Sequence, residues 1–432
     1  MPETPEAAPQ KRAARLMIAA IVALGLLARL ALALMMGDGR ATCLPESREY
    51  LAIGRSVADG NGFVLPGQSG PAEQTAREHP APGAAAAGSR PKLARRMPGY
   101  PALVAAAERM TSMPLRAVLL FQAACGGLTL IIAAWASWRL AGLWAGLVAV
   151  ALLAFDPYEV YFAALAVPVV PVGLALVAAM ALGLKFIASV EARSRWAWVW
   201  AAGTGLAAAA AAYFDAWAAG LVVPVGVAAA LAGLRRRLLA GWALGTVVLL
   251  VCLAPWMIRN TARLGAPILT TLTGERLFEA APMHCSCGVP TRREAEGLDE
   301  VGQDVFYLKS ALGEMAGAPA QWLKLAALRV GRLWSLGPIL EGGDAVIHPA
   351  AGYTTLLPSA ILAMVGVWAL RRRRSTVAWL LLAPLWLTVV HAVLAAPPEE
   401  RFEVMPALAV LGGAGLMALV GRQKQAPTGV SG

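Results

Sequence analysis

The stretch E-S-R-E-Y-L-A-I-G-R-S-V-A-D-G-N-G-F, Glu46 to Phe63, follows closely on an apolar run at 16–36 that is long enough to cross a membrane. It opens a polar segment that continues to R-R-M-P-G-Y-P, ending at Pro101, and most of the chain beyond is apolar. A loop that carries acids and arginines at the first exit from a bilayer is a place where chemistry at a membrane surface can be built. The fold is therefore read outward from this segment.

Composition places the chain among polytopic membrane proteins. Of its 432 residues 58% are hydrophobic and only 15% are charged, whereas soluble domains carry roughly 25% charged residues. We expect an all-α fold with roughly ten transmembrane helices. The apolar runs lie at 16–36, 114–138, 142–162, 166–188, 196–213, 216–234, 238–256, 351–370, 376–396 and 403–421. The transmembrane domain is predicted to cover 16–421, with a disordered tail at 1–15 and a second tail at 422–432.

Basic residues set the predicted orientation. They gather before the first run and in short connections that all fall on one side: Lys11, Arg12, Arg15, Arg193, Arg195, Arg235 to Arg237, Arg371 to Arg374, Arg422 and Lys424. The positive-inside rule makes this side cytoplasmic, so the large loops 37–113 and 258–350 face outward from the cytoplasmic (inner) membrane. The net charge of +11 reflects this topology, and no nucleic-acid partner is expected because there is no soluble basic domain.

The outer loops contain predicted interfacial helices. Apolar residues recur at helical spacing over 46–60, and Gly60-Asn61-Gly62 is expected to end that helix. Residues 66–91 are rich in Pro, Gly and Ala and predict a mobile loop. Short helices are expected over 98–110, 291–315 and 321–336, the last with basic residues between its apolar ones.

Several polar residues have a structural explanation as well as a functional one. Arg29 lies inside the first apolar run, where a snorkelling or paired structural arginine is the favoured interpretation. Cys43 could bridge to Cys285 or Cys287 in an oxidising compartment. His284 beside Cys285-Ser286-Cys287 invites a metal interpretation, but the spacing is not typical of zinc sites. We predict no metal site and no cofactor, and leave a dependence on divalent metal open.

Glu46 is the strongest candidate for a catalytic base. Tyr50 lies four residues on, on the same helix face, whereas Glu49 is expected to lie off that face. A carboxylate at the edge of a bilayer can accept a proton from a hydroxyl, although residue chemistry alone favours a carboxylate that interacts with the helix dipole. Asp156, in another outer connection, could supply a second acid.

Two arginines on the predicted outer side could bind phosphate. Arg96, preceded by Lys92 and Arg95, comes before a stiff Pro98–Pro101 turn, and Arg259 closes a span at Pro255-Trp256-Met257-Ile258-Arg259-Asn260. A guanidinium is suited to bidentate phosphate binding. Contact with lipid headgroups is the simpler alternative for both.

Taken together, these motifs resemble the GT-C fold glycosyltransferases that use polyprenyl-phosphate sugars, in the branch of the protein mannosyltransferases and aminoarabinose transferases. The family pattern has an acid, a Tyr four residues on, a helix ending in G-x-G-F, then R-x-P-x-Y-P, P-W-x-x-R-N, a G-x-x-L segment and R-[YF]-x-x-P. In this chain the similar positions are Glu46, Tyr50, Gly60–Phe63, Arg96–Pro101, Pro255–Asn260, Gly274–Glu279 and, offset by one, Arg401–Pro406.

The resemblance implies transfer of a sugar from a polyprenyl-phosphate donor, at the outer membrane face, with inversion at the sugar. It implies Glu46 as base, arginines at Arg96, Arg259 and Arg401 on the donor phosphate, and Tyr50 and Tyr100 on the substrate. The sugar and the acceptor, whether lipid, glycan or protein, are not specified.

The chain also departs from the family pattern. The usual Asp is Glu46, Val167 replaces an acid in the sequence Ala166-Val167-Pro168, and an arginine usual in a later segment is replaced near Asp215. These changes keep open a degenerate family member that acts as a membrane scaffold. A lipid or solute transporter is a further alternative, although such proteins more typically show internal repeats and polar sites at the bilayer midplane.

Overall fold

The structure is a computed structural model that describes residues 7–66, 91–222, 236–281, 295, 297–336 and 351–423. Its described residues are almost entirely helical, as predicted. Among them, six helices are long and apolar enough to cross a membrane. These are α1 (Ala7–Met35), α6 (Pro114–Ala141), α9 (Val169–Glu191), α10 (Ala197–Phe214), α12 (Arg236–Leu264) and α18 (Arg374–Val393). Further apolar helices pack with them: α7 (Leu143–Ala154), α17 (Ala351–Ala369) and α19 (Met405–Gln423).

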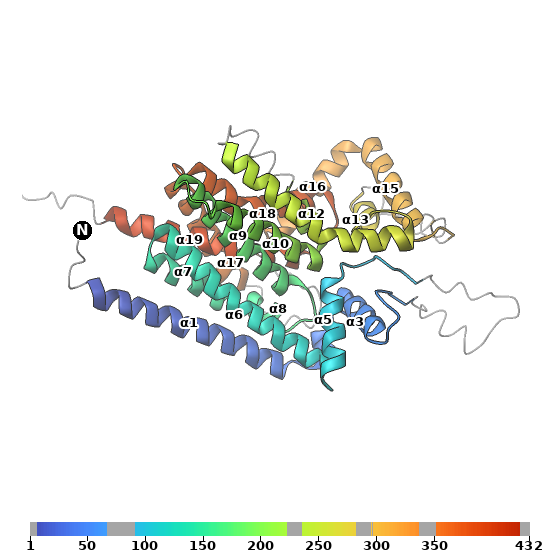
Figure 1. Ribbon diagram of the computed structural model, residues 1–432, viewed down its shortest axis with the longest axis horizontal. Helices are drawn as coiled ribbons and strands as arrows, with labels where there is room; N and C mark the ends of the chain where they lie inside the picture. Colours follow the sequence, from blue (N-terminus) through green and yellow to red (C-terminus); the bar gives the residue numbers. More distant parts are fainter. Residues whose placement is uncertain are drawn as a thin grey trace, which may run out of the picture.

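Shorter helices gather at one end of this bundle, where Figure 1 shows α3, α5, α13 and α15. They come from the two predicted outer loops: α2 (Asp38–Ala41), α3 (Pro45–Ala58), α5 (Gly99–Met110), α13 (Thr273–Glu279), α15 (Glu300–Gly317) and α16 (Pro319–Leu333). The predicted helices over 46–60, 98–110 and 321–336 are confirmed within a few residues, whereas the one predicted over 291–315 begins later, at Glu300. The predicted mobile loop lies almost wholly outside the described residues, as do Cys285, Cys287 and His284.

Two predicted spans differ from the structure. The run 142–162 is divided between α7 and the short helix α8 (Pro157–Phe162), because Asp156 caps α8 and Pro157 occupies its first position. The run 216–234 begins as the 3-10 helix η1 (Ala216–Leu221), and most of the remainder lies outside the described residues.

Arg29 is held inside the bundle by pairing, as the sequence favours. Its side chain is buried, donates through Nη1 to the Gly25 carbonyl (3.0 Å) and through Nη2 to the Leu153 carbonyl (3.1 Å), and lies 4.0 Å from Glu159 Oε2. It crosses the backbone of Gly126, where an added Cβ would meet its Cδ at 2.7 Å. The arginine therefore fastens α1 to α7 and α8.

Small residues bring α10 and α12 into backbone contact. A Cβ built on Gly205 would lie 2.1 Å from the Gly245 carbonyl oxygen, which no real Cβ tolerates. Such close approach is how helices associate in lipid, where apolar surface alone supplies little driving force. Gly205 and Gly245 thus allow α10 and α12 to pack backbone to backbone.

We predict that Gly205→Val destabilises the bundle by about 1–3 kcal/mol, the typical cost of overpacking. Gly203→Val is the matched control on the same helix, because its nearest atom, Leu182 Cδ1, lies at an ordinary 3.5 Å. Thermal unfolding of both variants in the same detergent is the measurement. Equal midpoints for the two variants would contradict the proposed backbone contact.

Candidate active site

A cleft of about 410 Å³ opens at the loop end of the bundle. Its walls come from the start of α3, the end of the first outer loop, α13, α16 and the segment that follows α18. Many of the side chains that line it are acids or arginines, and His391 also lines it. The acids and arginines are Glu46, Glu49, Arg95, Arg96, Glu275, Arg276, Glu279, Arg329 and Arg332. The two predicted outer loops thus meet in one polar hollow.

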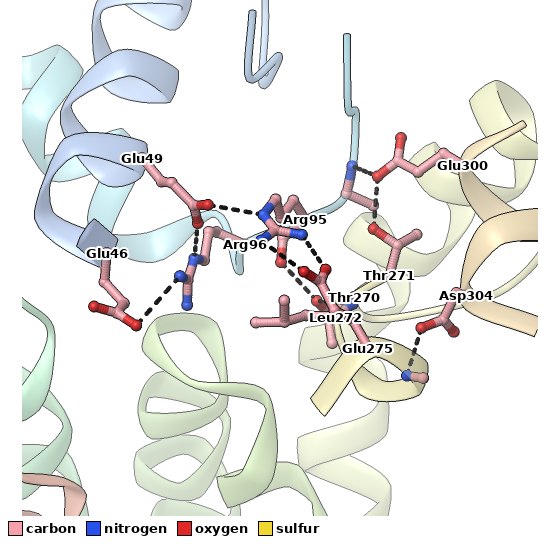
Figure 2. Close-up of polar contacts among 12 residues, drawn as sticks. Glu46, Glu49, Arg95, Arg96, Thr270, Thr271, Leu272, Glu275, Glu300 and Asp304 are labelled. Carbon is pink, nitrogen blue, oxygen red and sulfur yellow. Dashed lines mark hydrogen bonds and ion pairs between the residues drawn. The ribbon is translucent and has the colours of Figure 1, made fainter. Parts of the chain in front are cut away.

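The Glu49 carboxylate lies at the centre of this arrangement (Figure 2). One oxygen accepts from Arg95 Nε at 2.9 Å and the other accepts from Arg96 Nε at 2.6 Å. The prediction that Glu49 lies off the Glu46 face is wrong, because residues three apart on a helix are neighbours. Burial alone would raise the pKa of Glu49, but Arg96 and Arg95 outweigh it and hold the pKa below its ordinary value.

Arg95 carries the connection to the second outer loop. Its Nη1 donates to Glu275 Oε2 on α13 at 2.5 Å. Glu300, at the start of α15, completes the join by accepting from the Leu93 and Ala94 amides at 2.5 and 2.9 Å, and from Thr271 Oγ1 at 2.6 Å. Figure 2 shows the contacts of Arg95 and, beside them, those of Glu300.

Glu46 lines the cleft without being held as tightly. Its side chain is 27% exposed and its carboxylate lies 3.9 Å from Arg96 Nη2, an ion-pair distance beyond hydrogen-bond range. The Arg96 guanidinium in turn lies 5.2 Å from the ring centre of Tyr50. Arg96 therefore places a positive charge near Glu46 while its Nε bonds Glu49.

The two predicted substrate tyrosines form a buried pair beneath Arg96. Tyr50 and Tyr100 meet edge to face at 5.1 Å, and both rings are buried. The Tyr100 hydroxyl donates to Gln122 Oε1, which belongs to α6. Neither ring is among the residues that line the cleft. Tyr50 contacts the Arg96 guanidinium, and Tyr100 packs on Tyr50.

The opposite wall holds a buried ion pair. Arg276 Nη1 lies 3.2 Å from Glu400 Oε1, and Glu400 belongs to the 3-10 helix η3 (Pro398–Glu403). Burial raises the pKa of Glu400 to about 8 and that of its neighbour Glu399 to about 7. The Glu399–Phe402 segment is buried beside the cleft-lining residue Arg276.

Three other predicted site residues lie outside the cleft lining. Arg259 donates to the Leu93 and Phe63 carbonyls at 2.7 and 3.2 Å and so joins two segments of the first outer loop. Arg401 is buried and donates to the Leu333 and Ser335 carbonyls at 3.0 and 2.7 Å. Asp156 is buried as the N-cap of α8. All three side chains have structural partners.

Sequence reasoning missed three arginines of the cleft, Arg276, Arg329 and Arg332. Arg276 stands in the Gly274–Glu279 segment, which resembles the G-x-x-L motif of the family. Arg276 occupies one of the unspecified positions of that motif, so the motif does not identify it. Arg332 belongs to α16, whose basic residues look like headgroup contacts when only helical periodicity is considered. Among the described residues, no group of three or more His, Cys, Asp or Glu could hold a metal ion.

We predict that Glu49→Gln lowers stability by about 2 kcal/mol, because two partly buried arginines lose their shared counter-charge. The Glu49 pKa is lowered on folding, so its contribution is complete above the ordinary carboxyl value of 4.5 and is lost as pH falls through the folded-state pKa. Unfolding midpoints should therefore differ at neutral pH and converge in acid.

The matched control is Glu108→Gln, which removes a partner of Arg55 at 3.1 Å in a pair whose Arg side chain is 66% exposed. Such pairs contribute about 0–1 kcal/mol. Equal losses in the two variants would mean that Glu49 is not a structural centre of the cleft.

No protein-family model matches the chain, and no curated protein matches it. Solved structures do match. The archaeal oligosaccharyltransferase AglB from Archaeoglobus fulgidus, in complex with an inhibitory peptide and a dolichol-phosphate, aligns with a TM-score of 0.55 and 11% identity over 96% of this chain and 52% of that chain. The apo form of the Archaeoglobus fulgidus oligosaccharyltransferase aligns with a TM-score of 0.53 and 12% identity, over 91% of this chain and 50% of that chain. ArnT from Cupriavidus metallidurans in the apo state aligns with a TM-score of 0.45 and 17% identity, over 94% of this chain and 78% of that chain.

The chain thus spans about half the length of the AglB structures that it matches. The AglB alignments, with TM-scores above 0.5, cover nearly all of this chain. At 11% and 12% identity, the similarity lies in the fold and not in the amino-acid sequence. The chain is therefore an all-α, multi-pass membrane protein with the GT-C fold seen in AglB.

Proposed function

We propose that this protein is a membrane glycosyltransferase that moves a sugar from a polyprenyl-phosphate donor to an acceptor. The observation that carries the proposal is the cleft in which Glu46, Arg96, Arg276 and Arg332 converge at one end of a GT-C bundle. A base for the acceptor and cations for a departing phosphate are the two requirements of this reaction. The complex of AglB with a dolichol-phosphate adds a lipid phosphate on the same fold.

The arginines suit the leaving group. As the bond between sugar C1 and the phosphate oxygen breaks, negative charge develops on the lipid phosphate. Guanidinium groups fixed in advance around that position stabilise the charge without reorganising. Arg96 is held by Glu49 and Arg276 by Glu400, so both can present positive charge from a fixed position.

Glu46 is the better base of the two acids on α3. Glu49 is occupied by two arginines and its pKa is lowered, which makes it a weak proton acceptor. The Glu46 carboxylate lines the same cleft. Among the residues that the structure describes, it makes only the longer 3.9 Å contact with Arg96. We assign the base to Glu46 and the positioning of Arg96 to Glu49.

The proposed reaction is a single displacement. The acceptor loses its proton to Glu46 and its electron pair forms a new bond to sugar C1. The bond from C1 to the phosphate oxygen breaks, and the lipid phosphate leaves with that electron pair. Attack from the face opposite the leaving group inverts the configuration at C1.

The orientation belongs to the same proposal. The basic connections Arg193–Arg195 and Arg371–Arg374 are at the opposite ends of α9 and α18 from the residues that lead to the cleft. By the positive-inside rule, the cleft then faces the extracytoplasmic side of the cytoplasmic membrane.

We predict that Glu46→Gln lowers sugar transfer by about 10² or more with donor binding nearly intact, since the amide cannot take the proton. Glu46→Asp should retain part of the activity, because the carboxylate survives with a shorter reach. Transfer is measured in membranes with matched expression, using the same lipid-linked sugar throughout. Glu108→Gln, outside the cleft, is the control and should transfer normally. Full activity of Glu46→Gln would remove Glu46 from the mechanism.

We also predict that Arg332→Lys raises the donor concentration needed for half-maximal rate by about tenfold, since Lys keeps the charge but loses the bidentate fork. Arg109→Lys is the control, because Arg109 binds the Val57 and Ala58 carbonyls at the end of α3 opposite to Glu46. Donor titration of both variants is the measurement. An unchanged titration for Arg332→Lys would exclude this arginine from phosphate recognition.

A further inference from the structure

A second hollow lies among the membrane helices, well away from the cleft. It is an apolar groove of about 470 Å³ between α9, α10, α12 and α18, which Figure 1 shows as one group of helices. The close approach of Gly205 to Gly245 brings two of its walls together. The proposed transferase reaction makes no use of this groove.

The groove reaches through one half of a bilayer. It is lined by 176–187 of α9, 238–249 of α12 and 374–383 of α18, and each of these stretches is about 15 Å long at 1.5 Å per residue. The hydrocarbon core of a bilayer is about 30 Å thick. Farther along α18, Trp386 packs on Gly220 and donates to the Trp217 carbonyl at 3.0 Å. These contacts separate the groove from the cleft residue His391.

The open end of the groove is basic. Arg374 lines the groove itself, and a smaller hollow of about 270 Å³ shares Phe186 with it and is lined by Arg193, Arg195 and Arg237. All four arginines are exposed. No acid is among the described residues that line either hollow, and Glu191, two residues before Arg193, is the nearest acid along the chain.

Two polar atoms inside the apolar wall have no partner. Trp242 Nε1 and Thr246 Oγ1, one helical turn apart on α12, are buried without a hydrogen bond among the described residues. Burying such groups without a partner costs free energy. Trp242 and Thr246 lie 5 and 9 residues from Arg237, or roughly 8 and 14 Å into the groove, where an acceptor group of a ligand would satisfy them.

We propose that this groove binds one anionic glycerophospholipid from the leaflet at the basic end of the bundle. One acyl chain fills the apolar groove, whose depth is that of one leaflet. The ester oxygens accept from Trp242 Nε1 and Thr246 Oγ1, and the phosphate lies between Arg237 and Arg374. Basic pockets between membrane helices bind anionic headgroups in this way. The site does not depend on the proposed transferase function.

The test uses the full chain in nanodiscs of phosphatidylcholine that contain a tenth of phosphatidylglycerol. Native mass spectrometry then counts the lipids retained after release into detergent. We expect one phosphatidylglycerol per chain. Arg237→Gln with Arg374→Gln should reduce its preference over phosphatidylcholine by about 25-fold, since each arginine near an anionic headgroup contributes about a factor of five.

Two comparisons make the result specific. Arg371→Gln with Arg372→Gln removes the same charge from the neighbouring connection and should leave retention unchanged. Ala378→Phe fills the groove and should abolish retention while the arginines remain. Equal retention of both lipids, equal losses in the two arginine pairs, or one-for-one displacement of phosphatidylglycerol by a polyprenyl phosphate would overturn the proposal.

Discussion

The arrangement of the loop end of the bundle depends on one carboxylate held between two guanidinium groups. Glu49 bonds both Arg95 and Arg96, and Arg95 passes the connection on to Glu275. Charges that are partly withdrawn from water persist only when they are paired in good geometry. This pairing therefore fixes α3, the end of the first loop and α13 relative to one another, and the cleft is the space that they enclose.

Most of the fold could be predicted from the sequence because its signals are local. Apolar length marks the membrane helices, and the spacing of Tyr50, Leu51 and Ile53 marks the helix at 46–60, which the structure places at Pro45–Ala58. The interruption at Asp156-Pro157 was missed because the surrounding residues are apolar enough to form one span. There, the Asp156 side chain caps a new helix, although the hydropathy of the run predicts one continuous helix.

The site could be predicted only in part, because its partners are distant in the sequence. Arg95 and Glu275 are 180 residues apart, and no periodicity reveals that they meet. Motif position also identified arginines whose guanidinium groups bind backbone carbonyls, as Arg259 and Arg401 do. Arg276 and Arg332, which line the cleft, stand in helices whose basic residues look ordinary in the sequence.

The departures from the family pattern do not empty the cleft of charge. Asp215 caps η1, and Val167 is buried in the apolar core, so neither position supplies a side chain to the lining. Acids and arginines from α3, α13, α16 and the segment before α5 line the hollow instead, and Glu400 of η3 pairs with Arg276. The proposed transferase function rests on these residues, Glu46 among them, rather than on Val167 or Asp215.

The most direct test of the central claim is a structure of the chain determined with a polyprenyl phosphate bound. The account predicts the phosphate in the cleft, within hydrogen-bond distance of at least one of Arg96, Arg276 and Arg332, and within reach of Glu46. A phosphate that lies instead at the other end of the bundle, beside Arg374, would contradict it.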